Sequence, residues 1–239
     1  MPDRPVLVLS CEHGGHEVPA PYARLFRGAS AVLKSHRGWD PGSLTLAARL
    51  AETLGAPFHA QTVTRLLIDA NRSLHHRGLF SEFTRALDSS EKKALIESVW
   101  RPHRERVERA IDREILRGRA VLHLCVHSFT PVLGRVERNA DLGLLYDPRR
   151  EPERALCRRW RAALGHAAPD LRVRMNYPYR GVADGFTTHL RRLHSPEAYL
   201  GVELELNQAI PRRAPLGWTR LQSVVARTLR ETLVAADPS

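Results

Sequence analysis

Two histidines follow apolar segments of the chain at the point where each segment ends. His13 comes shortly after the run at residues 5–10, and His127 directly follows residues 120–126. Neutral imidazole is a good zinc ligand, and catalytic zinc usually has three protein ligands and one open position. A lone histidine in such a place is more often an ordinary hydrogen-bonding residue. With two such histidines and a carboxylate nearby, a metal site and ordinary hydrogen bonding become equally good interpretations. Candidates for the third ligand are Glu12, His16, Glu17, His36 and Asp40.

Two glutamates lie two residues apart near the end of the chain. Glu203 and Glu205 share one face of a predicted strand, while Val202, Leu204 and Leu206 point to the other. Alternation alone favours a solvent-exposed polar face. The functional alternative is a general base that takes a proton from zinc-bound water.

Basic and aromatic side chains could bind an anionic substrate. Asn71 and Arg72 closely follow the apolar residues 66–68, and Arg65 directly precedes them. A guanidinium in this place could clamp a carboxylate through two parallel hydrogen bonds, although a surface salt bridge is the alternative. Tyr179 could line a substrate pocket, or it could pack in the core. The chain contains no Walker loop, GxSxG elbow or HExxH, which argues against a phosphate-loop nucleotidase, a typical serine hydrolase and a zincin.

Alternating strands and helices must position these groups. The order favours a largely parallel sheet with helices on both sides, in one domain over residues 1–239. Sites in such sheets form at the carboxyl ends of strands. We predict strands at 5–10, 58–63, 66–68, 120–126, 142–146, 171–175 and 199–206. We predict helices at 40–54, with Asp40 as N-cap, at 90–117, with Ser90 as N-cap and a break at Pro102, and at 153–164, 187–193 and 218–234.

Composition sets the broad class. The 239 residues are 43% hydrophobic and carry a net charge of +11, which fits a globular protein. The arginines are scattered without interleaved aromatic residues, so we expect no nucleic-acid partner, although the charge could steer an anionic substrate. The three cysteines have no CxxC spacing, which favours a reducing compartment. No signal peptide or membrane-length apolar run is visible, so we expect a cytoplasmic protein, and its oligomeric state stays open.

Six blocks, in order, resemble the motifs of the N-formylglutamate amidohydrolase family and span most of the chain. They are SCEHGG with a following VP (10–19), HRGWDPG (36–42), RLLIDANRS (65–73), HSFTP (127–131), NYPYRG with a following DG (176–185) and GVELELNQ (201–208). This family is related in fold to the zinc carboxypeptidases and the aspartoacylase-like deacylases. The resemblance therefore implies a phosphorylase/hydrolase-like three-layer α/β/α sandwich, with a mixed, mostly parallel sheet and one bound zinc ion.

One motif departs from the pattern of these relatives. They use a His-x-x-Glu pair for two ligands, but the residue three positions after His13 is His16, and Glu17 is one position too late. We therefore expect His13, Asp40 and His127 to hold the zinc, with His36 as the alternative to Asp40.

The resemblance also implies roles for the remaining residues. Asn71 and Arg72 match the pair that binds the substrate carboxylate, and Glu205 matches the general base, with Glu203 as the second choice. Arg65 could assist the oxyanion, and Arg180, near Tyr179, could bind a second carboxylate. The predicted reaction is hydrolysis of a small N-acyl amino acid, N-formylglutamate or similar. The alternative is a non-catalytic basic protein of this fold that binds an anionic ligand or nucleic acid.

Overall fold

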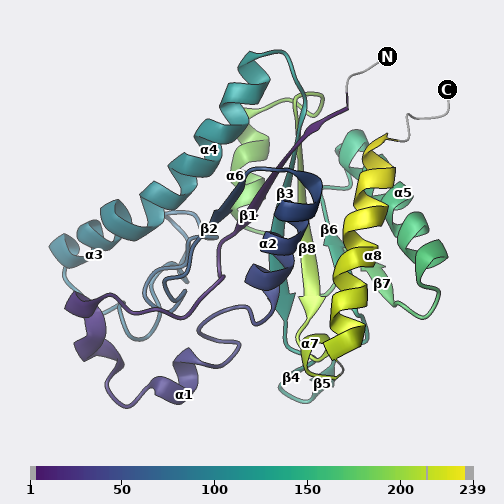
Figure 1. The fold of residues 1–239 in the computed structure, drawn as a ribbon. Helices are drawn as coiled ribbons and strands as arrows, with labels where there is room; N and C mark the ends of the chain where they lie inside the picture. Colours follow the sequence, from purple (N-terminus) through teal and green to yellow (C-terminus); the bar gives the residue numbers. More distant parts are fainter. Residues whose placement is uncertain (1–3, 214, 235–239) are drawn as a thin grey trace.

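A mixed six-stranded sheet forms the centre of the molecule (Figure 1). The computed structural model describes residues 4–213 and 215–234. The strand order is β2-β1-β3-β8-β6-β7; the first four are mutually parallel, β6 runs antiparallel to β8, and β7 is parallel to β6. The strands are β1 (Val6–Cys11), β2 (Phe58–Ala60), β3 (Val121–Phe129), β6 (Leu142–Leu145), β7 (Val173–Met175) and β8 (Tyr199–Asn207).

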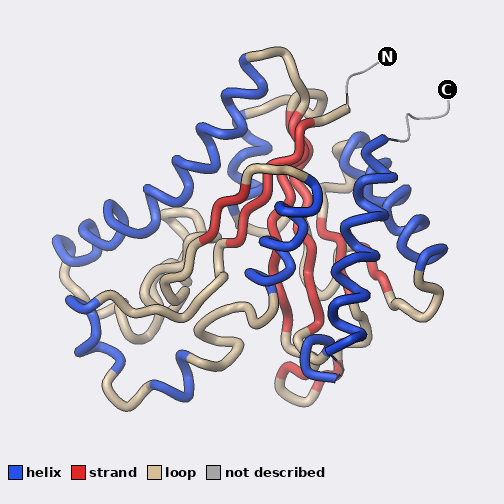
Figure 2. The backbone as a smooth tube through the Cα atoms, viewed as in Figure 1, coloured by secondary structure: helices blue, strands red, loops and turns tan. Residues whose placement is uncertain are grey.

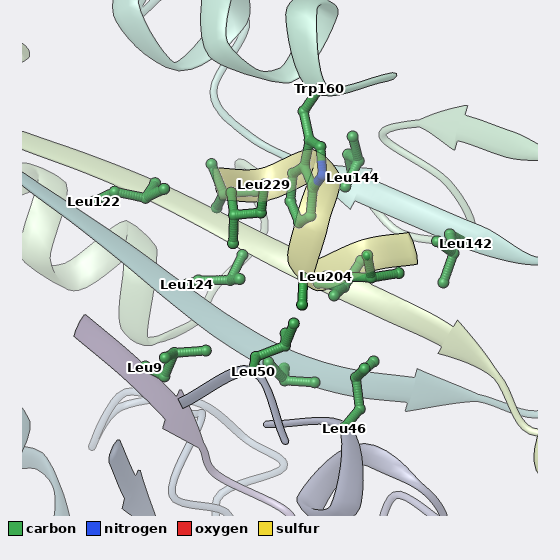
Figure 3. Close-up of a cluster of buried hydrophobic side chains, with 14 of the residues drawn as sticks. Leu9, Leu46, Leu50, Leu122, Leu124, Leu142, Leu144, Trp160, Leu204 and Leu229 are labelled. Atoms are coloured by element: carbon green, nitrogen blue, oxygen red, sulfur yellow. The ribbon is translucent and has the colours of Figure 1, made fainter. Parts of the chain in front are cut away.

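Helices cover both faces of this sheet (Figure 2). One face packs against α2 (Ser43–Leu54), α5 (Glu151–Ala167) and α8 (Pro215–Val234), and the other against α4 (Arg101–Leu116) and α6 (Phe186–Leu193). Successive strand residues point to opposite faces, so Leu122 and Leu124 enter the first core, which is shown in Figure 3, while Val121 enters the second. The expected α/β/α sandwich with a mixed, mostly parallel sheet is confirmed.

Shorter elements extend the molecule beside β2. They are η1 (Ala20–Phe26), α1 (Ser30–Leu33), α3 (Ser89–Leu95) and the π-helical turn η2 (Ile96–Trp100), which together with the 61–88 loop form a separate apolar cluster. The hairpin β4 (Val132–Leu133) and β5 (Val136–Glu137) follows β3, and α7 (Ile210–Arg213) follows β8. None of the described helices has the length and apolar composition needed to cross a membrane.

Three local expectations were wrong. Residues 66–68 lie in a turn instead of a strand; Leu67 and Ile68 are buried in the separate cluster, and no strand in the described part of the chain pairs with them. Helix α2 begins at Ser43 with Gly42 as N-cap at φ +88°, so Asp40 does not cap it. Helix α3 is capped by Asp88 in a capping box with Glu91 and not by Ser90. The first two differences matter for the site, because they leave Asp40 and the 69–72 turn free to face the sheet.

Candidate active site

His13, Asp40 and His127 meet at the carboxyl ends of β1 and β3. Nδ1 of His127 lies 3.0 Å from Oδ2 of Asp40, and Nδ1 of His13 lies 3.3 Å from the same oxygen. The three residues are 2–3% exposed, and their ligand atoms lie within 4.8 Å of one another. The backbone N–H of Asp40 donates to the carbonyl of His13 at 2.9 Å, which ties the 36–42 loop to the end of β1. Two imidazoles and one carboxylate are a donor set suited to zinc.

One further carboxylate lies beside the second nitrogen of each imidazole. Nε2 of His13 lies 2.7 Å from Oδ1 of Asp69, and Nε2 of His127 lies 3.2 Å from Oε2 of Glu12. Metal-binding histidines commonly pair their second nitrogen with a carboxylate, which fixes the ring and leaves the other nitrogen for the metal. Here that arrangement leaves both Nδ1 atoms facing Asp40. The residues therefore fit a divalent metal ion.

The other candidate ligands lie elsewhere. The ring of His16 packs against Trp39 at a centroid distance of 5.2 Å, and His36 is exposed. Among the described residues these two histidines are not part of either group that could hold a metal. Their positions support Asp40 as the third ligand.

A second buried group, Glu12, His123 and Cys125, also has ligand atoms close together. However, Nε2 of His123 lies 2.8 Å from Oγ of Ser10, and its Nδ1 lies 2.9 Å from the hydroxyl of Tyr199. Burial lowers the pKa of His123 to about 4, so the ring is neutral. Because both ring nitrogens already have partners, this group is better explained as a hydrogen-bonded part of the core.

Glu205 and Glu203 extend from β8 on the same face as His127. Glu205 pairs in register with His127, and Glu203 pairs with Cys125. Glu205 is only 4% exposed, so the solvent-exposed polar face does not describe it. Its Oε2 has no hydrogen-bond partner among the described residues, and burial raises its pKa to about 8. Glu203, in contrast, accepts a 2.6 Å hydrogen bond from Oγ1 of Thr187.

Arg65 lines the site and is paired with two aspartates. Its guanidinium donates to Oδ2 of Asp69 at 2.8 Å and to Oδ1 of Asp40 at 3.3 Å. Burial by itself would raise the pKa of Asp40, but His13, His127 and Arg65 hold it well below its ordinary value. Asp40 is therefore ionised at neutral pH, as a metal ligand must be.

The 69–72 turn carries the two predicted carboxylate-binding residues. Nδ2 of Asn71 lies 3.4 Å from Nε2 of His127, while its Oδ1 accepts from the backbone N–H of Phe186 at 2.7 Å. The guanidinium of Arg72 donates to the backbone carbonyl of Asp184. The turn is thus linked to both β3 and the loop before α6.

The ten predicted site residues line one cavity of about 160 Å³. Tyr179 and Arg180 form its exposed side, and the tyrosine hydroxyl accepts a 3.1 Å hydrogen bond from Arg138. A larger cavity of about 300 Å³, bordered by Leu171, Ile210 and Leu221, contains none of these residues. The structure brings the predicted residues together, and their individual roles stay predictions.

Sequence reasoning missed the outer carboxylates and their partners. The sequence suggests Glu12 only as a metal ligand and assigns no role to Asp69. The available signals for a role in the site are that Glu12 directly precedes His13 and that Asp69 lies two residues before Asn71. His103 of α4, whose Nε2 lies 3.4 Å from Oε1 of Glu12, gave no signal because it is distant in sequence.

The raised pKa of Glu205 predicts a pH effect on metal-free protein. Its folded pKa, about 8, exceeds its ordinary value of 4.5, so folding favours the protonated form. This stabilisation is fully present below the unfolded pKa and is lost as pH rises through the folded pKa. With a chelator present, we expect the free energy of unfolding to fall between about pH 5 and about pH 8 by roughly 3 kcal/mol more in the wild type than in Glu205→Gln.

Urea unfolding at the two pH values measures this difference. Glu203→Gln is the matched control and should keep most of the pH dependence of the wild type, because burial is the largest cause of the raised pKa of Glu205 and the charge of Glu203 is a smaller one. Equal pH dependence in wild type and Glu205→Gln would contradict the prediction.

A family model and two solved structures resemble this chain over most of its length. The sequence model for N-formylglutamate amidohydrolase matches residues 5–210. A gene product of Agrobacterium tumefaciens has a similar structure, with a TM-score of 0.80 and 28% identity over 97% of this chain and 91% of that one. An N-formylglutamate amidohydrolase from Ralstonia eutropha JMP134 shares the fold, with a TM-score of 0.68 and 20% identity over 97% and 95% of the two chains. No curated protein matches the chain.

Proposed function

Because this chain belongs to the N-formylglutamate amidohydrolase family, we propose that it cleaves the amide of a small N-acyl amino acid in a zinc-dependent reaction. The products are a carboxylate and the free amino acid, and N-formylglutamate is the first substrate to test. The observation that carries this proposal is the cavity in which His13, Asp40 and His127 converge beside Glu205, whose buried Oε2 has no hydrogen-bond partner in the described part of the chain.

Nδ1 of His13, Nδ1 of His127 and a carboxylate oxygen of Asp40 would hold the metal. When bound, zinc would supply Lewis acidity toward water and the substrate carbonyl, and its charge would favour the ionised form of Glu205. Glu205 then accepts a proton as the water oxygen attacks the carbonyl carbon. It returns that proton to the leaving nitrogen as the C–N bond breaks.

The remaining residues bind and orient the substrate. Asn71 and Arg72 bind the carboxylate of the amino acid, and Arg180 with Tyr179 binds a second carboxylate. Arg65 already donates to two aspartates, and the N–H groups left on its guanidinium assist the oxyanion. The cavity of about 160 Å³ is smaller than the roughly 300–1,000 Å³ of drug-sized ligand pockets, which supports a compact substrate.

A substrate panel tests the proposed function. Purified protein, assayed with and without added zinc, is offered N-formyl and N-acetyl amino acids together with the α-amides of the same compounds. We expect zinc-dependent release of the free amino acid from acids with a short acyl group, and poor turnover of the amides. No zinc in the purified protein and no deacylation of any panel member after zinc addition would show that the proposal is wrong.

Arg72→Met tests the carboxylate-binding role. Loss of a charge-assisted hydrogen bond costs about 1.5–3 kcal/mol, so we expect kcat/KM to fall about tenfold to a hundredfold, mainly through KM. The discrimination between acids and α-amides should shrink as well. Arg49→Met, which removes an exposed arginine of α2 paired with Glu52, is the control and should leave KM unchanged. An unchanged acid-to-amide preference in Arg72→Met would rule out this role.

The proposal also covers the cellular compartment and the domain organisation of the protein. Cys11, Cys125 and Cys157 are unpaired and buried, which supports a reducing compartment such as the cytoplasm. The central six-stranded sheet with helices on both faces supports one domain over the chain. Nothing in the described residues favours the alternative of a non-catalytic binder.

A further inference from the structure

We propose that Trp100 and Arg104 are positioning residues that hold the 69–72 turn in the geometry needed to bind the substrate carboxylate. The inference rests on the proposed function, in which Asn71 and Arg72 make that contact. Neither residue lines the cavity, so both act through the backbone of the turn.

Trp100 is the last residue of the π-helical turn η2, between α3 and α4. Its indole Nε1–H donates to the backbone carbonyl of Arg72 at 2.9 Å, and the side chain is buried. Hydrogen bonds in a π-helical turn run i→i+5, so the turn takes up one extra residue and rotates those that follow around the helix axis. Trp100 lies where η2 meets α4, and from there its indole contacts the backbone of the 69–72 turn.

Arg104 lies one helical turn later and is only 2% exposed. Its guanidinium carbon lies 4.5 Å from the ring centroid of Trp100 and 4.1 Å from that of Phe186, so the cation is held between two aromatic rings. It donates to the carbonyl of Ala70 at 3.3 Å, while its Nε has no hydrogen-bond partner among the described residues. Burying a guanidinium in this way is costly, and stacking on the rings offsets only part of the cost.

Phe186 contacts both Arg104 and the 69–72 turn. It begins α6, and its backbone N–H donates to Oδ1 of Asn71 at 2.7 Å. The turn is therefore bound at three consecutive residues, through the carbonyls of Ala70 and Arg72 and the side chain of Asn71. Because Oδ1 of Asn71 is engaged, its Nδ2 faces His127 and the cavity.

Holding the turn before the substrate arrives lowers the ordering cost of binding. Loosening it should therefore raise KM, while the groups that act on the scissile bond, such as Glu205 on β8, stay in place. The metal site should also stay intact, because Asp69 is tied separately through its backbone N–H to the carbonyl of Leu79.

Trp100→Phe tests this inference, with Trp160→Phe as the matched control. The first change removes the indole donor but keeps a ring beside Arg104. The control removes another buried indole hydrogen bond, from Trp160 to Thr228 at 3.1 Å, in the core between the sheet, α5 and α8 (Figure 3). Loss of one such bond corresponds to about threefold to tenfold in an equilibrium constant. We expect that rise in KM for Trp100→Phe, with kcat and zinc content unchanged, and no rise for Trp160→Phe.

Amide hydrogen exchange at residues 71–73 provides a readout that does not depend on activity. Exchange should be faster than wild type in Trp100→Phe and unchanged in Trp160→Phe. Arg104→Lys, which keeps the charge but cannot stack as a planar group, should also raise KM and speed exchange, and it serves if Trp100→Phe does not fold.

The outcomes separate the two proposals. If both tryptophan variants lose stability equally and neither KM nor exchange distinguishes them, Trp100 is only a core residue and the inference is wrong. If the wild type cleaves no member of the substrate panel, the proposed function fails, and exchange at the turn still decides whether these residues position it.

Discussion

Glu205→Gln is expected to lower kcat by about a hundredfold to ten-thousandfold while zinc content stays at the wild-type level. Glutamine has nearly the shape of glutamate but cannot accept a proton. Glu205 is placed for that role because it is buried, pairs in register with His127 and has an oxygen with no partner among the described residues. Zinc analysis of the purified variant, together with steady-state kinetics on the best panel substrate, makes the measurement.

Glu203→Gln is the matched control, since it makes the same change two residues away on the same strand face. Glu203 already accepts a hydrogen bond from Thr187, so we expect its loss to affect turnover far less. The reverse result, with Glu203→Gln inactive and Glu205→Gln active, would exchange the two roles. If both variants keep wild-type kcat, neither glutamate is the base.

Asp40→Asn is expected to have the second large effect, on both metal binding and stability. One oxygen of Asp40 faces the Nδ1 atoms of both histidines, and the other accepts from Arg65. A neutral amide offers a weaker ligand and places a nitrogen among these groups. Changes that only disturb the support of a metal ligand cost about tenfold to a hundredfold in affinity, so replacing a ligand should cost at least about a hundredfold.

The same change should destabilise the metal-free protein. Removing one partner of a buried charged group costs roughly 3–5 kcal/mol, because the remaining charges lose their compensation. Isothermal titration with zinc and urea unfolding in chelator measure the two effects. His36→Asn, on the same loop but exposed, is the control and should change neither. Wild-type zinc affinity in Asp40→Asn together with weakened affinity in His36→Asn would make His36 the ligand.

The sequence alone determined the central architecture and the identity of the chemical groups. Buried strands such as β1 and β3 appear as short apolar runs because both faces of a central strand must be hydrophobic, and helix faces repeat apolar residues at helical spacing. Local rules of this kind also placed His13 and His127 near the ends of two such strands. The ordered blocks around them indicated the family before any fold was known.

The tertiary structure decided what lies opposite each of these groups. Strand periodicity puts Glu203 and Glu205 on one face. Only packing shows that Thr187 donates to Glu203, whereas Oε2 of Glu205 has no hydrogen-bond partner within residues 4–213 and 215–234. Local patterns predicted a cap at Asp40 and a strand at 66–68, whereas contacts with His127 and with the apolar cluster prevail there. Trp100 reaches the turn across 28 residues of sequence, a contact between distant segments that no local pattern encodes.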